Sequence, residues 1–392
     1  MSLSDKPFDI VVFGASGYTG RLVAEYLAAE YAGSDLKWAM AGRSLEKLAA
    51  VRAEMGISEA VELLAVDVDN PDSVTQMVDA CQVVITTVGP YQLYGDELVK
   101  QCAERGTDYV DLTGEPSWMH ETIAQYSSAA KASGARIVHS CGFDSIPFDL
   151  GVYRLQQHAI AKTGQPIAMV KGRVRAMNGT FSGGTIASMR ATMASAKANP
   201  AIIQVLTNPF ALTEGFTGPE QPAGMAPQYD EELKSWSAPF IMAPINTKNI
   251  HRSNFLLGHQ YGEDFRYDEM LLTGDGDQGK AAADYVAKDD SVAKSDLQPG
   301  EGPTKEEREN GNYDAIFAGE TQDGELMISS VQGDRDPGYG STSKMLAEAA
   351  MCLLVNPDLA SGGLWTPAAA MGDALMARLQ EHAGLTFKIE KG

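Results

Sequence analysis

Cysteine is scarce in this sequence, with four residues in a chain of 392 and no C-x-x-C pair. Disulfide scaffolds and thiolate metal sites need closely spaced cysteines, so neither is indicated and no bound metal is expected. Cys81, Cys102, Cys141 and Cys352 are instead expected to be buried free thiols in a reducing compartment.

Positive charge and long apolar runs are also in short supply. The chain carries 31 Lys and Arg against 52 Asp and Glu, a net charge of −21. Nucleic acid and anionic membranes bind clustered positive charge, so both are excluded as partners. No run of about 18 apolar residues is present, and MSLSDKPFDI lacks the basic and apolar regions of a signal peptide. A cytoplasmic protein without an integral membrane segment is therefore expected.

The N-terminal part has the pattern of an α/β protein with a doubly wound parallel sheet. Strand-like segments at 8–14, 36–42, 61–68, 83–89, 108–112 and 135–142 alternate with five helix-like segments. This alternation predicts a Rossmann domain over residues 1–150.

The pattern changes after residue 150. Residues 169–177 alternate as a half-exposed strand does, residues 251–274 look rich in strand, and residues 313–333 predict a hairpin turning at Asp323 and Gly324. The most polar stretch, 275–312, should hold one short helix with Thr304 and Glu307 as a capping box. These features predict a second, mixed or antiparallel α+β domain at 151–340.

Residues 341–392 contain two amphipathic helical segments. The sequence leaves open whether they cover the second domain or pack back on the Rossmann domain. An exposed sheet in the second domain would also be compatible with a homodimer.

The stretch VVFGASGYTG predicts a dinucleotide site. Gly14, Gly17 and Gly20 follow a strand and open a helix, which is the context that a dinucleotide fingerprint requires. The glycines allow a turn with positive φ, close approach of the pyrophosphate, and helix-to-strand packing. The predicted binding residues of this loop are Gly14, Ser16, Gly17, Tyr18, Thr19 and Gly20.

The end of the second strand favours NADP over NAD. An NAD site usually has an acidic residue there, whereas this chain has Arg43 and Ser44 in AMAGRSLEK. A guanidinium pairs with a 2′-phosphate that a carboxylate would repel. Asp67, at the end of the third strand, is a candidate for contacts to the adenine.

The fourth strand ends in TTVGPY, where ligands of this fold lie beside the switch point of the sheet. Thr87, Val88, Gly89 and Pro90 are therefore expected along the cofactor toward its nicotinamide. Tyr91 is a candidate proton donor, with a stacked wall of the site as the favoured alternative.

Several motifs together resemble a known family. GASGYTG, AGRS, TTVGPY, YVDLTGE, HSCGFDSIPFDLG, FSGGT, PGEGP and GDRDPGYGSTSKM are similar to those of saccharopine dehydrogenase-like oxidoreductases, most of all the trans-acting enoyl reductase branch. The resemblance implies an NADPH-binding Rossmann domain, a mixed-sheet substrate domain and closing helices that return to the first domain. It also implies reduction of a carbon–carbon double bond in a polyketide or fatty acyl chain.

Enoyl reduction requires a hydride for the β-carbon, stabilisation of an enolate oxygen and a proton for the α-carbon. The catalytic candidates are Tyr91, His139 and Asp144. Ser182 and Thr185 of FSGGT would suit an anionic substrate group or a helix cap. Whether the acyl chain is carrier-bound, linked to coenzyme A or free is left open. An acidic carrier would need a basic face, for which Lys171, Arg173 and Arg175 are candidates.

Three alternatives remain at the level of sequence. Saccharopine-type reduction of a C–N bond would need arginines for carboxylates, and Arg173, Arg175, Arg190, Arg252 and Arg266 are available. An acyl-phosphate reductase would need Cys141 as a nucleophile, in a turn that differs here from the expected one. A non-catalytic NADPH-binding sensor or scaffold would need the nucleotide site alone.

Overall fold

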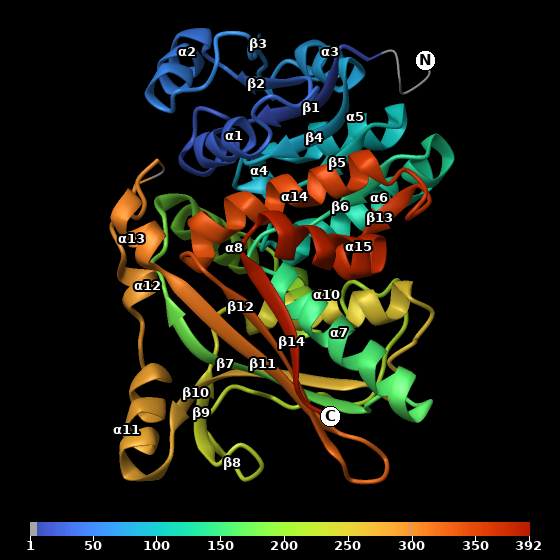
Figure 1. Ribbon diagram of the computed structural model, residues 1–392, viewed down its shortest axis with the longest axis vertical. Helices are drawn as coiled ribbons and strands as arrows, with labels where there is room; N and C mark the ends of the chain where they lie inside the picture. Colours follow the sequence, from blue (N-terminus) through green and yellow to red (C-terminus); the bar gives the residue numbers. More distant parts are fainter. Residues whose placement is uncertain (1–5, 299) are drawn as a thin grey trace.

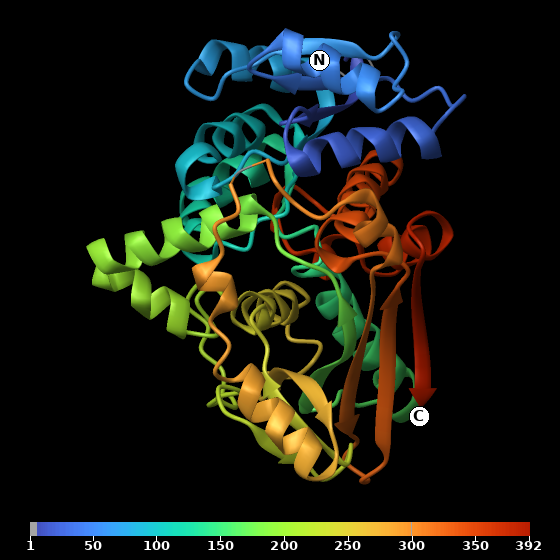
Figure 2. The same ribbon diagram turned by 90° about the vertical axis from the view of Figure 1, so that its left-hand side faces the viewer.

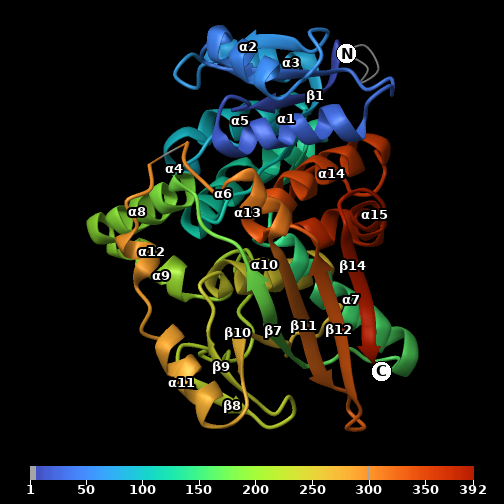
Figure 3. The ribbon, with the colours of Figure 1, turned by 60° about the vertical axis from the view of Figure 1, so that its left-hand side comes forward.

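The computed structural model describes residues 6–298 and 300–392, and it divides into two sheets placed one above the other along the long axis (Figure 1). Each sheet has seven strands. A layer of helices that includes the two C-terminal helical segments lies between them, as the turned views in Figures 2 and 3 also show. The predicted α/β architecture with two domains is confirmed.

The first sheet is entirely parallel, in the order β13-β6-β5-β4-β1-β2-β3. Its strands are β1 (Phe8–Phe13), β2 (Trp38–Gly42), β3 (Glu62–Ala65), β4 (Cys81–Thr86), β5 (Asp108–Val110), β6 (Arg136–Val138) and β13 (Gly363–Trp365). The helices between them are α1 (Tyr18–Glu30), α2 (Leu45–Glu54), α3 (Pro71–Ala80), α4 (Tyr91–Tyr94), α5 (Asp96–Arg105) and α6 (Pro116–Ser133). The first six strands are those that the sequence pattern predicted.

Alternate residues of β1 divide the core of this domain in two. Ile10 and Val12 belong to one hydrophobic cluster, which also takes in residues of α1 and α2. Val11 and Phe13 point to the other face and join a second cluster with residues of α3, α5 and α6. A strand covered on both faces reads as a continuous apolar run, which explains the signal in FDIVVF.

The second sheet is mixed, in the order β14-β12-β11-β7-β10-β9-β8, with only β7 and β10 parallel. Its strands are β7 (Met169–Asn178), β8 (Gln228–Asp230), β9 (Ser235–Pro239), β10 (Arg266–Gly274), β11 (Asn312–Glu320), β12 (Leu326–Gly333) and β14 (Leu385–Lys391). The remaining helices are α7 (Ile146–Thr163), α8 (Gly183–Ala198), α9 (Pro200–Thr207), α10 (Ala243–Leu256), α11 (Gly276–Val286), α12 (Ser291–Lys294), α13 (Lys305–Asn310), α14 (Thr342–Val355) and α15 (Pro367–His382), with a π-helical turn η2 (Pro337–Ser341).

Two local predictions in this half are confirmed. β11 and β12 form the hairpin, and Gly324 in the loop has φ +80°, the left-handed conformation that glycine tolerates. Thr304 caps α13, and Glu307 bonds back to the Thr304 backbone, which completes the capping box.

The prediction of a strand-rich stretch at 251–274 is wrong for its first part, because residues 251–256 lie in α10. This helix has polar side chains on several of its faces that are nevertheless buried, including those of Asn249, Arg252 and Ser253. Each bonds to a different neighbour: Asn249 to Ser145, Arg252 to the carbonyls of Leu212 and Leu364, and Ser253 to Asp149. A helix buried through such contacts has no apolar stripe, so the sequence shows no helical periodicity of hydrophobic residues there.

Of the two C-terminal helices, α14 returns to the first domain, whereas α15 packs mainly against α7, α10 and α14. α14 packs against α1 and the inner face of the first sheet, and its residues join the same hydrophobic cluster as β1. Arg136 of β6 donates to the carbonyls of Leu353 and Asn356, at 2.8 Å each, and so satisfies the free carbonyls at the end of α14. β13 then extends the first sheet and β14 extends the second, and neither strand was predicted.

A long segment crosses between the two halves on one side of the molecule. Residues 291–298 and 300–304, called here the crossing segment, include α12 and run from α11 past α1 to α13 (Figures 2 and 3). In the described part of the chain, no helix is long and apolar enough to span a membrane.

Candidate functional site

The glycine-rich loop joins β1 to α1 with the geometry of a nucleotide cradle. Gly14 has φ +88°, and a Cβ there would lie 2.8 Å from the Thr87 hydroxyl. A Cβ at Gly20 would lie 2.2 Å from the Gly14 carbonyl, so that position also requires glycine. Gly17 precedes α1, whose first turn has no acidic residue and no side-chain cap. The free N–H groups of that turn suit a diphosphate.

The predicted 2′-phosphate residues lie at the adjoining edge of the sheet. Arg43 is exposed directly after β2, and Ser44 caps α2 by accepting from the Lys47 N–H. The Ser16 hydroxyl faces the end of β2, where it lies 3.6 Å from the Cβ position of Gly42. The loop and the end of β2 therefore bring Ser16 and Arg43 to one edge of the sheet, and their contact with a 2′-phosphate stays a prediction.

Asp67 lies farther along the same edge, after β3. It is half-buried, and its Oδ1 accepts from the Asp69 N–H at 3.2 Å. This turn engages one carboxylate oxygen of Asp67. The adenine contact remains a prediction.

The loop after β4 lies against the glycine-rich loop. The Thr87 N–H donates to the Phe13 carbonyl at 3.0 Å, and a Cβ at Gly14 would also lie 2.8 Å from Val88. Gly89 is exposed, and Pro90 precedes α4. Thr87 to Pro90 are thus adjacent to the nucleotide cradle, in the place where the nicotinamide half of a dinucleotide lies in this fold.

Tyr91 points into the protein. Its hydroxyl donates to the Thr86 carbonyl at 3.1 Å and accepts from the Leu112 N–H at 3.3 Å, and its ring stacks on Trp118. Only 4% of the residue is exposed, and burial raises its pKa well above the ordinary value. The side chain has the surroundings of the stacked wall rather than those of a proton donor.

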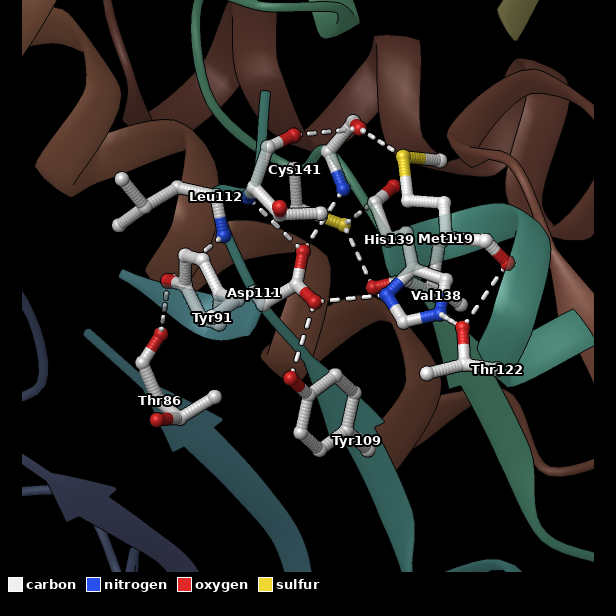
Figure 4. Close-up of polar contacts among 12 residues, drawn as sticks. Thr86, Tyr91, Tyr109, Asp111, Leu112, Met119, Thr122, Val138, His139 and Cys141 are labelled. Carbon is white, nitrogen blue, oxygen red and sulfur yellow. Dashed lines mark hydrogen bonds and ion pairs between the residues drawn. The ribbon is translucent and has the colours of Figure 1, made fainter. Parts of the chain in front are cut away.

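His139 belongs to a buried polar network (Figure 4). Its Nδ1 lies 2.6 Å from Asp111 Oδ2, and its Nε2 lies 3.2 Å from the Thr122 hydroxyl. Asp111 also accepts from Tyr109 and from the N–H groups of Thr113 and Ser140. Every polar atom of the pair is therefore occupied within the protein, and the network joins the ends of β5 and β6.

Asp144 differs from the other two catalytic candidates. It is half-buried in the turn before α7, with one carboxylate oxygen 3.0 Å from the Cβ position of Gly114. Burial raises its pKa to about 7. A carboxyl group that holds a proton near neutral pH and lies at the carboxyl ends of β5 and β6 is suited to general acid catalysis.

Glu115 links the two halves at this site. Its carboxylate accepts from the N–H groups of Tyr91 and Gln92 at 2.9 Å each, and so caps α4. The Ser188 hydroxyl of α8 donates to the same carboxylate at 2.8 Å. Glu115 thereby fixes α8 over the loop that contains Gly89.

Tyr18 and Tyr339 pack together beside the nucleotide loop. Their rings meet edge to face at 5.2 Å. The Tyr18 hydroxyl donates to the Pro303 carbonyl, and the Tyr339 hydroxyl contacts the Ser182 N–H and lies 2.9 Å from the Thr185 hydroxyl. FSGGT is therefore held by a tyrosine beside the nucleotide loop. Tyr339 was not singled out from the sequence, although it lies in the quoted GDRDPGYGSTSKM segment.

The basic residues of the second domain are mostly paired with carboxylates. Lys171 pairs with Glu232, Arg173 with Asp268, and Arg175 with Glu390. The basic patch considered for an acidic carrier is thus neutralised by its own neighbours. Two further arginines were considered for a substrate carboxylate and bond to the backbone instead. Arg252 donates to the carbonyls of Leu212 and Leu364, and Arg190 donates to the Ser295 carbonyl.

Comparison with known proteins gives consistent relatives. The family described as "Saccharopine dehydrogenase NADP binding domain" matches residues 10–138. A Mycobacterium tuberculosis protein provisionally named a trans-acting enoyl reductase is 40% identical over 97% of both chains. The trans-acting enoyl reductases of Mycobacterium bovis and Mycobacterium ulcerans are 35% and 34% identical, again over 97% of both chains.

Among solved structures, saccharopine dehydrogenase (L-Glu forming) from Saccharomyces cerevisiae is similar in fold. The TM-score is 0.55 at 13% sequence identity, over 97% of this chain and 99% of the yeast chain. At that identity the similarity shows the fold alone: both halves of the molecule have a counterpart in one known protein.

Proposed function

Because the chain belongs to the saccharopine dehydrogenase-like oxidoreductases, in the trans-acting enoyl reductase branch, we propose that it reduces the C=C bond of an enoyl substrate with NADPH. The observation that carries the proposal is the nucleotide cradle of Gly14, Gly17 and Gly20. A half-buried carboxyl group, Asp144, follows β6 of the same sheet, and burial raises its pKa to about 7.

The residues present fit NADPH. Gly14 and Gly20 leave no room for side chains against Thr87, so the loop is shaped for backbone contact with a diphosphate. Ser16, Arg43 and Ser44 would hold the 2′-phosphate, and Thr87 to Pro90 would line the nicotinamide half. NADPH, when bound, supplies the hydride that the reduction needs.

Asp144 is the proton donor in this proposal. Its raised pKa keeps a proton available near neutral pH for the α-carbon of the substrate. His139 and Tyr91 act through position: His139 joins the ends of β5 and β6 through Asp111, and Tyr91 supports the loop after β4. Ser188 and Glu115 hold α8 over the same loop and help to exclude water from it.

A saccharopine-type substrate is less well supported. Of the five arginines considered for an amino-acid carboxylate, four are engaged and only Arg266, at the start of β10, is exposed without a described side-chain bond. The engaged ones are Arg173 and Arg175, held by carboxylates, and Arg190 and Arg252, held by backbone carbonyls. The names of the relatives favour an acyl chain brought by a second protein. The proposal includes an acyl substrate that is linked either to a carrier protein or to coenzyme A. It also includes a homodimer, a cytoplasmic location and domain boundaries at residues 150 and 340.

The test is a turnover assay in which NADPH oxidation is followed at 340 nm with trans-2-enoyl thioesters and, separately, with imino-acid substrates. Oxidation that requires the enoyl thioester, with the saturated thioester as product, is expected. Binding of NADPH without oxidation across both panels would instead favour a sensor, and turnover of the imino acids alone would favour C–N reduction.

A further inference from the structure

A cavity of about 390 Å³ lies between the base of α8 and the crossing segment. One wall contains Phe181 and Ile186, at and before the first turns of α8. The facing wall contains Val292, Leu297 and Pro303. Its volume is within the range of small-molecule sites, and five of its ten lining residues are these apolar ones, with two on one wall and three on the other.

The charges around the cavity favour an uncharged ligand. Its lining includes one carboxylate, that of Glu307, and no Lys or Arg among the described residues. The Glu307 carboxylate is engaged in the cap of α13, where it accepts from the Thr304 N–H at 2.7 Å and the Thr304 hydroxyl at 2.8 Å. The two nearby guanidinium groups, those of Arg190 and Arg308, are engaged by backbone carbonyls, so the lining suits an uncharged group better than a carboxylate or phosphate.

The inner end of the cavity reaches the nucleotide loop. Gly302 and Pro303 line the cavity and lie against Tyr18, the first residue of α1. A Cβ at Gly302 would lie 2.6 Å from the Tyr18 ring, so the segment and the ring are in direct contact. The cavity therefore begins beside the loop that would hold the cofactor.

The outer wall is fixed to the second domain. Arg190 of α8 donates to the Ser295 carbonyl at 2.6 Å, and the Gly183 N–H donates to the Glu301 carbonyl at 3.1 Å. Arg308 adds a bond to the Pro303 carbonyl at 2.8 Å. The first two bonds join the two walls, and the third braces the crossing segment against α13.

We propose that this cavity receives the saturated, distal part of the acyl chain and so selects substrates by chain length. The inference rests on the proposed function, because the double bond of the same chain would have to lie beside the loop that contains Gly89. The apolar walls supply the binding energy, and their separation limits the bulk of the chain.

Val292→Trp, which fills the cavity from its half-buried outer wall, tests the proposal. We expect kcat/KM for trans-2-dodecenoyl-CoA to fall at least about tenfold, while that for crotonyl-CoA changes less than about twofold. Ala168→Trp is the matched control, because Ala168 is exposed beside a second cavity of about 320 Å³ at the far end of the second sheet. It should leave both values unchanged.

Equal losses for the two substrates, or a loss of NADPH affinity in place of an effect on chain length, would overturn the assignment. Leu297→Phe is a milder filling variant for use if Val292→Trp does not fold. Binding of saturated dodecanoyl-CoA by equilibrium dialysis separates this proposal from the proposed function. If the unmodified protein turns over no enoyl thioester, weaker dodecanoyl-CoA binding by the filled variant still supports the cavity, and unchanged binding overturns it.

Discussion

At the scale of single residues, the nucleotide site was readable from the sequence because its requirements are local. Gly14 and Gly20 are glycines for steric reasons that lie within one turn of chain and one neighbouring loop. The catalytic residue was harder to identify, since the side chains of Tyr91, His139 and Asp144 can all transfer a proton and the sequence does not show their surroundings. Their difference lies in contacts made by residues far apart in the sequence, such as Asp111 with His139.

Arg43 carries the choice of nucleotide. We expect Arg43→Ala to weaken NADPH binding by about tenfold or more, since a charge-assisted bond to phosphate is lost, and to change NADH binding little. Fluorescence titration with both nucleotides measures this. Lys47→Ala, one turn farther along α2 and exposed, is the control. Equal losses for NADPH and NADH would contradict a 2′-phosphate contact.

Asp144 carries the proton in our proposal. Asp144→Asn should lower kcat by about 10²-fold or more, while the NADPH Kd stays near its original value. In the unmodified protein, kcat should fall as the pH rises through about 7, because burial raises the pKa of Asp144 to that value. The variant should lack this alkaline limb. A limb that persists in Asp144→Asn would assign the titration to another group.

At the scale of secondary-structure elements, the sequence predicted those whose signal is contained within them. The six strands of the first domain, the β11–β12 hairpin and the capped helix α13 are of this kind. α10 was missed because its polar residues are satisfied by distant partners, which period analysis does not detect. β13, with three residues, and β14, with seven, were missed. Each one only extends a sheet whose other strands lie far away in the sequence, so no local pattern marks it.

The helices α1, α14 and α15 share one buried carboxylate, that of Glu348. It accepts from Tyr26 at 2.8 Å, Tyr31 at 2.6 Å and Arg378 at 2.9 Å, and it is fully buried. Glu348→Ala would leave these donors unpaired, so we expect a loss of about 3 kcal/mol in the free energy of unfolding. Urea denaturation measures it. Glu381→Ala, also in α15 and exposed, should change stability by less than about 0.5 kcal/mol.

At the scale of the whole molecule, buried carboxyl groups set the dependence of stability on pH. Burial raises the pKa of Asp144 and Asp149 to about 7 and that of Glu269 to about 8. A carboxyl whose pKa is higher in the folded state stabilises that state while it is protonated. This contribution to the free energy of unfolding is complete when the pH is below the carboxyl pKa of the unfolded chain, about 4. It is lost as the pH rises through the folded-state pKa values of about 7 to 8.

The thermal midpoint should therefore fall between pH 6 and pH 8.5, by on the order of 5 °C. Burial lowers the pKa of His251 to about 3, which opposes this trend only below about pH 6.5. Glu269→Gln should flatten the fall, and the exposed Glu263→Gln should not. Differential scanning fluorimetry across the pH range measures all three proteins. A midpoint that rises with pH in this window would contradict the assignment of the buried groups.

The return of the chain to both sheets has a consequence for biosynthesis. β13 completes one edge of the first sheet and β14 one edge of the second, so each sheet needs residues beyond position 360. Until α14 has been made, the nucleotide-binding half lacks the cover that this helix gives to the part of its sheet not covered by α1 and α2. The two halves therefore mature together after translation, and each is a poor candidate for expression as a separate fragment.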